Sequence, residues 1–530
     1  VFFSQRPPPN EAGGHGLLTT AAGLCEGAAR RAAPGGARPP SPRPMARSQE
    51  SKALAPHLQP TYKAAEGIGA GASPVNPPCF GSVDGQGHNG VGLTAGLLVA
   101  DVVGAGVLSA AVAVAQLGWL MGAVVIVVLF CMNMHTSVLM WRVRMGCPHA
   151  HTYMGLADAA FGAAPARQRE IVVALTGLAQ YSSLFGVLCL YTLSFGKAIG
   201  MSLYDVHVCL PMWTVLGCVL LLPFVVTSRS MGTWQSLIWF NILTIVGTVM
   251  VPLVEMARRS EGGANDRGSE FFAVAPMSLA STFAGLSTIS FAFSSQFMVV
   301  EIISEMKEPG DFPKAYLVSA PFQCFVLLLC GLGGYWYLGS SARGMILDNI
   351  PFGPSLQLSA ACLLLHMLVT YLLKGTVFCR AIHTYVDREG CNEDDTKAWA
   401  VWSTIVVAVL AGSWVVAQLV PFFGDMVELL GGTCTPLCCF VIPILTYVQW
   451  YRTLGGPDEA PSKLERCALA LELGLALALM VAVPVLSYSR ISGSWHEYGA
   501  PFSCHCEGLW NTCECSSERP GMDFCHAAHT

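Results

Sequence analysis

The residues whose types and spacing could do chemistry begin with Asp101, a carboxylate inside a long apolar stretch. Three residues later the chain reads Gly104-Ala105-Gly106, two glycines separated by a single alanine. A charged side chain within a membrane segment is costly, so it is a candidate functional residue by default. Glycine weakens a helix locally and lets a solute approach the backbone, although such glycines can also serve only close helix packing. We therefore predict a backbone-lined binding site beside an acidic group.

A second apolar stretch, residues 281–296, contains a glycine and many hydroxyl side chains. Unpaired backbone N–H groups in an interrupted helix suit a carboxylate, and unpaired carbonyls suit an ammonium or a metal cation. A zwitterion fits both, unless these hydroxyls only hydrogen-bond back to their own helix. The residues predicted to line a solute site are Val103, Gly104, Ala105 and Gly106 of the first stretch, and Ser290, Phe291, Phe293, Ser294 and Ser295 of the second.

Two carboxylates are candidates for ion coupling, Asp101 and Glu301. A carboxyl group shielded from water can bind and release a proton near neutral pH, or it can bind sodium directly. The alternative for Asp101 is a salt bridge, with Lys374 as the candidate partner, although we expect Lys374 to extend to the inner membrane surface. His135 and His366 are isolated histidines in apolar stretches, and we expect both to be buried with satisfied hydrogen bonds.

The composition indicates which elements must position these residues. Charged residues make up 12% of the chain, where a soluble protein has about 25%. Hydrophobic residues make up 53% and the mean hydropathy is +0.52, which predicts an all-α protein with several membrane-spanning helices. Apolar runs of about 20 residues predict eleven helices, at 92–116, 119–141, 170–198, 211–227, 234–256, 276–303, 315–338, 354–379, 398–418, 422–448 and 467–488.

Eleven helices can be divided into five, five and one extra. Transporters built from inverted repeats bind their substrate at mid-membrane, between broken helices in matching positions of the two halves. The first and sixth predicted helices match in this way. The predicted inner loops hold fourteen lysines and arginines and the outer loops hold five, which predicts a cytoplasmic N-terminus and an extracytosolic C-terminus.

The two ends of the chain differ in composition from the predicted transmembrane domain, residues 91–488. Residues 1–90 are rich in Pro, Gly, Ala and Arg, which predicts disorder, and Met45 is a candidate start. Residues 489–530 form a cysteine-rich tail in which disulfides, a zinc site or neither is the open question. Its cysteines are Cys504, Cys506, Cys513, Cys515 and Cys525.

Several segments between residues 91 and 488 together resemble the amino acid/auxin permease family, especially its plant-type amino acid permease branch. The segments are 103–109 (VGAGVLS) with 115–119 (AQLGW), 152–162 (TYMGLADAAFG), Glu301-Ile302 with 305–309 (EMKEP) and 312–314 (FPK), and 421–425 (PFFGD) followed by Gly431. The resemblance implies an eleven-helix fold of the LeuT type and secondary transport of amino acids. The chain departs from the family pattern at 110–113 (AAVA) and at Ser294-Ser295, which affects the expected substrate range.

The resulting functional prediction is a multi-pass membrane transporter that moves amino acids by proton-coupled symport, in the plasma membrane or in a vacuolar or other internal membrane. The alternatives are a sodium-coupled symporter and an amino acid sensor that does not transport. An enzyme is not expected, because the apolar stretches contain no H-x-x-x-D, G-x-S-x-G or H-E-x-x-H pattern. We predict an amino acid and membrane lipid as partners, and no cofactor, metal or nucleic acid.

Overall fold

The computed structural model describes residues 87–206, 208–229, 237–259, 269–276, 278–420, 423–455, 460–498 and 501–502. Secondary structure in these residues is helical apart from one isolated bridge, between Asn89 and Met306. Most of the segment predicted to be disordered, and the cysteine-rich tail beyond residue 502, lie outside the described residues.

Ten helical segments within the described residues are long and apolar enough to cross a membrane. Their elements are α4 (Trp119–Gly146), α6 (Ala166–Ser202), α7 (Leu210–Thr227), α8 (Ile238–Arg259), α9 with α10 (Leu279–Ala292, Gln296–Ser304), α11 with η4 and α12 (Phe312–Leu328, Leu329–Gly333, Gly334–Leu338), α13 (Pro354–Val386), α14 (Thr396–Leu419), α15 to α17 (Phe423–Gly432, Cys434–Pro436, Ile442–Thr453, with η8 at Leu437–Val441) and α18 (Lys463–Tyr498). The first predicted span is divided into α1 (Val91–Val102), α2 (Ala105–Leu108) and α3 (Ala110–Leu117), so no single piece reaches the required length. Together these segments correspond to the eleven predicted helices.

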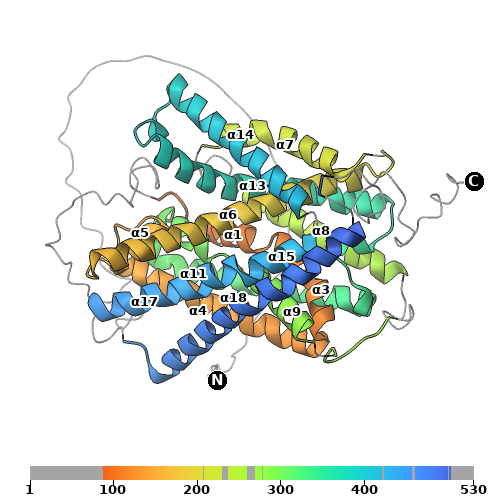
Figure 1. The fold of residues 1–530 in the computed structure, drawn as a ribbon, viewed down its shortest axis with the longest axis horizontal. Coiled ribbons are helices and arrows are strands. Elements are labelled where there is room, and N and C mark those ends of the chain that lie inside the picture. The colour runs from red at the N-terminus through yellow and green to blue at the C-terminus, as the bar shows by residue number, and fades with distance from the viewer. Residues whose placement is uncertain are drawn as a thin grey trace, which may run out of the picture. The chain divides into compact units, whose positions relative to one another are not determined.

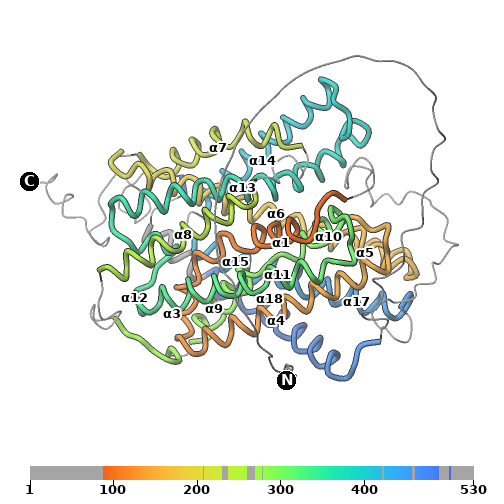
Figure 2. Tube along the Cα trace, turned by 180° about the vertical axis from the view of Figure 1, so that it is seen from behind, coloured from red at the N-terminus to blue at the C-terminus, as the bar shows by residue number. Residues whose placement is uncertain are grey.

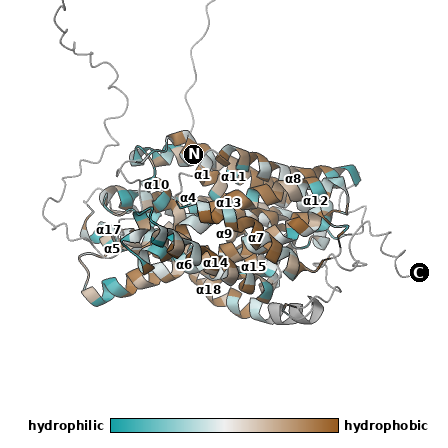
Figure 3. Cartoon of the chain, turned by 90° about the horizontal axis from the view of Figure 1, so that it is seen from above, coloured by the Kyte–Doolittle hydropathy of each residue, from teal (hydrophilic) through white to brown (hydrophobic). Residues whose placement is uncertain are grey.

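The sixth span forms the centre of the bundle and the last span lies at its edge. In the most apolar part of α9 and α10, 94% of the residues are buried inside the protein, against 28% for α18. Large apolar side chains such as Leu178, Leu243 and Val481 are more than two-thirds exposed and face outward, as lipid-facing residues do. Figure 3 shows hydrophobic residues over the middle of the helices and most hydrophilic residues near their ends.

The pieces of the first span pass through the middle of the bundle, next to the sixth span. α1 packs against α8 and α11, α3 packs against α9, and α13 packs against α6 and α8. Figure 1 shows α1 near the middle of the bundle behind α6, and Figure 2 shows it from the opposite side, next to α11. Two broken helices therefore lie side by side in the core, which is where the sequence placed the solute site.

Short elements connect the long helices. α5 (Tyr153–Ala160) was read from the sequence only as a loop, and it begins where Thr152 Oγ1 accepts from the N–H of Gly155 at 3.0 Å. The other short elements are the 3₁₀ turns η3 (Pro309–Asp311), η5 (Gly339–Ser341), η6 (Ile346–Asn349) and η7 (Gly390–Asn392). In the tenth span the helix is divided at Thr433 and continues as a π-helix after Pro436, where the missing proline N–H predicts an irregularity.

Candidate functional site

The first span is interrupted at the predicted place. α1 ends at Val102, Val103 and Gly104 leave helical geometry, and α2 begins at Ala105. The break removes the regular donors of the last carbonyls of α1, and the first N–H groups of α2 have no partner within that helix. Backbone groups of both kinds are therefore freed inside the apolar core.

The sixth span is interrupted in the matching position. α9 ends at Ala292 and α10 begins at Gln296, with the three residues between them outside regular helix. Ser294 Oγ donates back to the Phe291 carbonyl at 2.7 Å, as the alternative reading of the hydroxyls predicted. Ser290 Oγ is buried and has no hydrogen-bond partner among the described residues. Both predicted interruptions are confirmed.

The two breaks touch each other at Gly106. A Cβ atom at this position would lie 2.6 Å from the Cα atom of Ala292, so only glycine permits the contact. A small cavity of ≈ 10 Å³ lies beside it, which is about the space that one water molecule needs. Its lining residues are Asp101, Val102, Gly104, Ala105 and Gly106 from the first break, Phe291 and Ser294 from the second, Val187 and Tyr191 from α6, and Lys374 from α13.

Some predicted site residues line this cavity and others do not. Those at the cavity are Asp101, Gly104, Ala105, Gly106, Phe291 and Ser294; those away from it are Val103, Ser290, Phe293, Ser295 and Glu301. Phe293 instead packs on the Phe130 ring, with 5.3 Å between the ring centroids. The contributions of α6 were missed because Val187 and Tyr191 carry no signal within an ordinary apolar helix.

Asp101 and Lys374 form a buried ion pair across the first break. Lys374 Nζ lies 2.7 Å from Asp101 Oδ1 and donates to the Asp101 backbone carbonyl at 3.0 Å. The side chains are 4% and 3% exposed. The expectation that Lys374 reaches the inner membrane surface is wrong, because its ammonium has this anion within reach and aromatic rings of Tyr191 and Phe297 nearby. Asp101 Oδ2 is buried and has no partner among the described residues.

Glu301 lies away from the cavity and connects three elements. Its Oε1 accepts from the Tyr153 backbone N–H at 3.0 Å and from Gln180 Nε2 at 2.8 Å. Tyr153 in turn donates its hydroxyl to the Cys438 carbonyl at 2.6 Å. Glu301 therefore ties α10 to α5 and α6. Beyond the end of α10, burial raises the pKa of Glu305, and the nearby Arg380 partly opposes this shift.

Backbone contacts close the region at both ends. At the start of α1, the Asn89 N–H donates to the Glu305 carbonyl at 2.9 Å, and the Asn89 carbonyl accepts from the N–H of Lys307 at 3.0 Å. At the opposite end, Ala275 N–H donates to the Leu117 carbonyl at 3.0 Å. Between these contacts, the cavity at the two breaks has room for about one water molecule.

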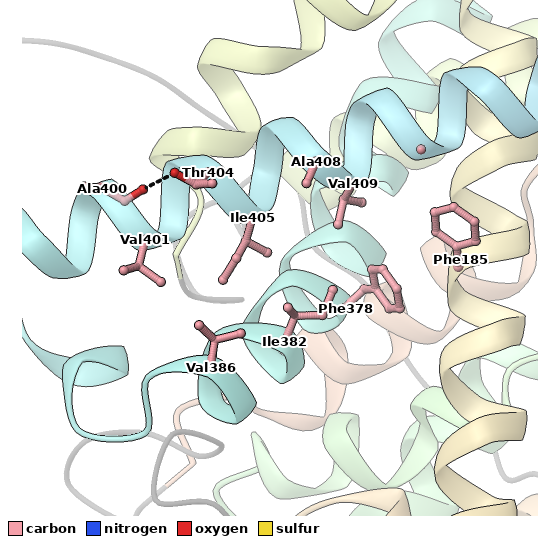
Figure 4. Close-up of a pocket in the computed structure, with 11 residues that line it drawn as sticks. Phe185, Phe378, Ile382, Val386, Ala400, Val401, Thr404, Ile405, Ala408 and Val409 are labelled. Atoms are coloured by element: carbon pink, nitrogen blue, oxygen red, sulfur yellow. Dashed lines mark hydrogen bonds between the residues drawn. The ribbon is translucent and has the colours of Figure 1, made fainter.

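A larger groove of ≈ 770 Å³ lies between α6, α13 and α14, and it has the wrong chemistry for a zwitterion. Figure 4 shows apolar side chains of α13 and α14 facing one another, with Phe185 of α6 at one end. The lining residues are Phe185, Phe378, Ile382, Val386, Ala400, Val401, Thr404, Ile405, Ala408, Val409 and Gly412. None is charged, and the hydroxyl of Thr404 already bonds to the Ala400 carbonyl.

Comparisons with known proteins agree with this geometry. A family model described as "Transmembrane amino acid transporter protein" matches residues 89–479. Amino acid permease 3 and amino acid permease 6 of Arabidopsis thaliana are 26% and 25% identical, over 63% of this chain and 77% of each relative. Auxin transporter-like protein 3 of Oryza sativa subsp. japonica is 24% identical over 36% of this chain and 34% of its own.

Among solved structures, the crystal structure of MhsT in complex with L-phenylalanine aligns with a TM-score of 0.51 at 13% identity. The alignment covers 76% of this chain and 99% of the MhsT chain. At this identity the likeness concerns the fold alone. The fold is the LeuT type that the sequence predicted, with its first and sixth helices broken.

Proposed function

The chain belongs to the transmembrane amino acid transporter family, and we propose that it moves amino acids by proton-coupled symport through alternating access. Two relatives named amino acid permeases support amino acids as the cargo. The observation that carries the proposal is the Asp101–Lys374 ion pair at the cavity where the two broken helices meet.

An ion pair beside freed backbone groups is complementary to the zwitterionic end of an amino acid. The α-carboxylate would accept from the first N–H groups of α2 and from the Lys374 ammonium. The α-ammonium would donate to the freed carbonyls at the end of α1. This leaves Asp101 Oδ2, the carboxylate oxygen that has no partner among the described residues, to take the proton. The cavity of ≈ 10 Å³ must widen before an amino acid fits, so binding is coupled to movement of the broken helices.

The position of Lys374 favours a proton over sodium as the coupled ion. Sodium is a hard cation that would need oxygen ligands, as calcium and magnesium do. The Lys374 ammonium already contacts two Asp101 oxygens, the backbone carbonyl and Oδ1. A proton on the Asp101 carboxylate would instead remove its negative charge and release Lys374, which would loosen the contact between α1 and α13. Binding and release of this proton would then shift the first break between a conformation with the ion pair formed and one with Lys374 released.

The test is uptake by the purified full chain in proteoliposomes, with a panel of radiolabelled amino acids and an imposed proton or sodium gradient. We expect accumulation with the proton gradient, which a protonophore abolishes, and no response to sodium. In Asp101→Asn, which nearly keeps the side chain's shape, we expect uptake that no longer varies with pH. Asp311→Asn, which changes a partly exposed carboxylate paired with Lys314, is the matched control.

Three outcomes would contradict the proposal. Accumulation driven by sodium and indifferent to the proton gradient would establish the sodium alternative. Wild-type uptake and pH response in Asp101→Asn would exclude this carboxylate. Amino acid binding without uptake at any gradient would establish a sensor.

A further inference from the structure

His366 presents an unpaired nitrogen inside the core. Its Nδ1 lies 3.4 Å from the backbone carbonyl oxygen of Asn241 in α8, and the residue has no exposed surface. A carbonyl can only accept, so Nδ1 carries the proton and the neutral ring holds a lone pair on Nε2. Nε2 is buried and has no partner among the described residues. The expectation of a satisfied histidine therefore holds for Nδ1 and fails for Nε2, whereas His135 pairs with Glu472 at 2.8 Å.

The unpaired nitrogen faces the first break. A Cβ atom placed on Gly104 would lie 3.8 Å from His366 Nε2 and 3.4 Å from the hydroxyl oxygen of Tyr191. Gly104 and Tyr191 both line the small cavity. His366 therefore lies directly behind the cavity, on the side of Gly104 where a side chain would project.

Asn241 adds a second unpaired group at the same junction of α1, α8 and α13. It is fully buried, and neither its Oδ1 nor its Nδ2 has a hydrogen-bond partner among the described residues. Buried polar atoms without partners are rare in folded proteins, because each loses its bonds to water and gains none. His366 Nε2 lies beside Gly104 at the cavity, and the Asn241 backbone contacts the other nitrogen of the same ring. An unpaired acceptor in this place points to a polar group that enters from the cavity.

We infer that His366 and Asn241 select the cargo's side chain, and that the preferred amino acids have neutral side chains with an O–H or N–H donor. A lone pair on His366 Nε2 accepts from a hydroxyl or a carboxamide and repels a carboxylate. The Lys374 ammonium lies two helical turns further along α13 and disfavours a cationic side chain. An apolar side chain would leave the buried groups unpaired. The inference rests on the proposed function, whose site it extends.

Isosteric amino acid pairs test this selection in proteoliposomes that contain the full chain. Threonine and valine have nearly the same shape, as do asparagine and leucine, and only the first of each pair has a donor. We expect the wild type to transport threonine and asparagine with about tenfold or greater kcat/KM over their partners, because a site built for a hydrogen bond rejects the analogue that lacks it. In His366→Leu we expect both ratios to fall by at least about fivefold, through a higher KM for threonine and asparagine.

Two further variants keep the test decisive. His383→Leu removes another histidine of α13 that is 1% exposed and also has an unpaired Nε2, and its ratios should equal those of the wild type. Asn241→Leu keeps the carbonyl that orients His366 and removes only the amide, so we expect a smaller fall than in His366→Leu. Retained valine and leucine uptake shows that a variant is folded. If His366→Leu loses this uptake, the ratios measured in Asn241→Leu test the inference instead.

The failures of the two proposals are distinguishable. If the wild type takes up no amino acid, the proposed function fails and this inference fails with it. If it takes up amino acids but the ratios are near one, or remain unchanged in both His366→Leu and Asn241→Leu, the inference alone is overturned. A bound water molecule would then be what pairs with His366.

Discussion

At the residue scale, the Asp101–Lys374 pair shows how far single positions could be read from the sequence. Asp101 was identified because a carboxylate in an apolar stretch is costly and therefore functional by default. Lys374 was expected to reach the membrane surface, which is the usual behaviour of an isolated lysine in an apolar helix. Its partner lies 273 residues away in the chain. Because no local pattern encodes such a contact, the sequence offered the salt bridge between Asp101 and Lys374 only as the alternative, and the structure shows that alternative.

The pair also makes a prediction about stability. Lys374→Met leaves Asp101 buried without its counter-ion, and breaking a buried ion pair from one side costs about 3–5 kcal/mol. Thermal unfolding of the detergent-solubilised chain should show this as a large fall in the transition temperature. The double variant Asp101→Asn with Lys374→Met should recover most of the loss, because neither charge remains unpaired.

The prediction would be contradicted if the double variant lost as much stability as the two single variants together. Such a result would mean that Asp101 and Lys374 are stabilised by separate partners rather than by each other. Lys314→Met, which removes a lysine that is 72% exposed in its ion pair with Asp311, is the control and should change stability by at most about 1 kcal/mol.

At the scale of elements, the two interruptions were predictable and their contact was not. The glycines at the start of α2 and the hydroxyl-rich end of α9 mark weakened helices, so the sequence placed both breaks correctly. Which residues of each break face the cavity depends on how α6 and α13 pack around them, and for this reason the sequence could not tell that Phe293 and Ser295 lie outside its lining. α5 was missed because eight residues carry too little periodicity.

Variants of Gly104 and Gly106 test two different properties. Gly106 tests how the two broken helices pack, and Gly104 tests the space for cargo. In Gly106→Ala the new methyl carbon meets the Ala292 backbone at 2.6 Å, so the breaks must move apart. We expect uptake to be lost and the free energy of unfolding to fall by about 1–3 kcal/mol. At Gly104 the nearest atoms are 3.4 and 3.8 Å away, so Gly104→Ala should keep the stability and raise the KM for uptake.

The two glycines are therefore expected to differ, although the sequence alone assigns both to the same site. Thermal unfolding and uptake, measured for both alanine variants, check the difference. Equal stability of the two variants would show that the contact between Gly106 and Ala292 does not hold the breaks together. An unchanged KM in Gly104→Ala would place the cargo elsewhere.

At the scale of the whole molecule, the eleven spans and the contacts at their ends support one consistent arrangement across the membrane. Asn89, before the first span, bonds with residues that follow the sixth. Leu117, the last residue of the first span, bonds with Ala275, just before the sixth. The first and sixth spans therefore run in opposite directions, as an inverted repeat requires. Which end faces the cytosol does not follow from packing, because the bundle would be equally compact either way up.

The orientation is predicted by the basic residues. Lys374 and Lys197 no longer count as loop residues, because each forms a buried ion pair, with Asp101 and Asp348 respectively. Thirteen basic residues remain on the predicted inner side and four on the outer side, and positively charged loops stay in the cytosol. With an odd number of spans, the N-terminus is then cytoplasmic and the cysteine-rich tail extracytosolic.

Epitope tags at each terminus, and a third tag in the loop between α13 and α14, should show this in selectively permeabilised cells. The N-terminal and loop tags should require permeabilisation of the cytosolic face, whereas the C-terminal tag should not. Two termini on the same side would contradict the count of eleven, and a reversed pattern would mean that the basic loops do not set the orientation.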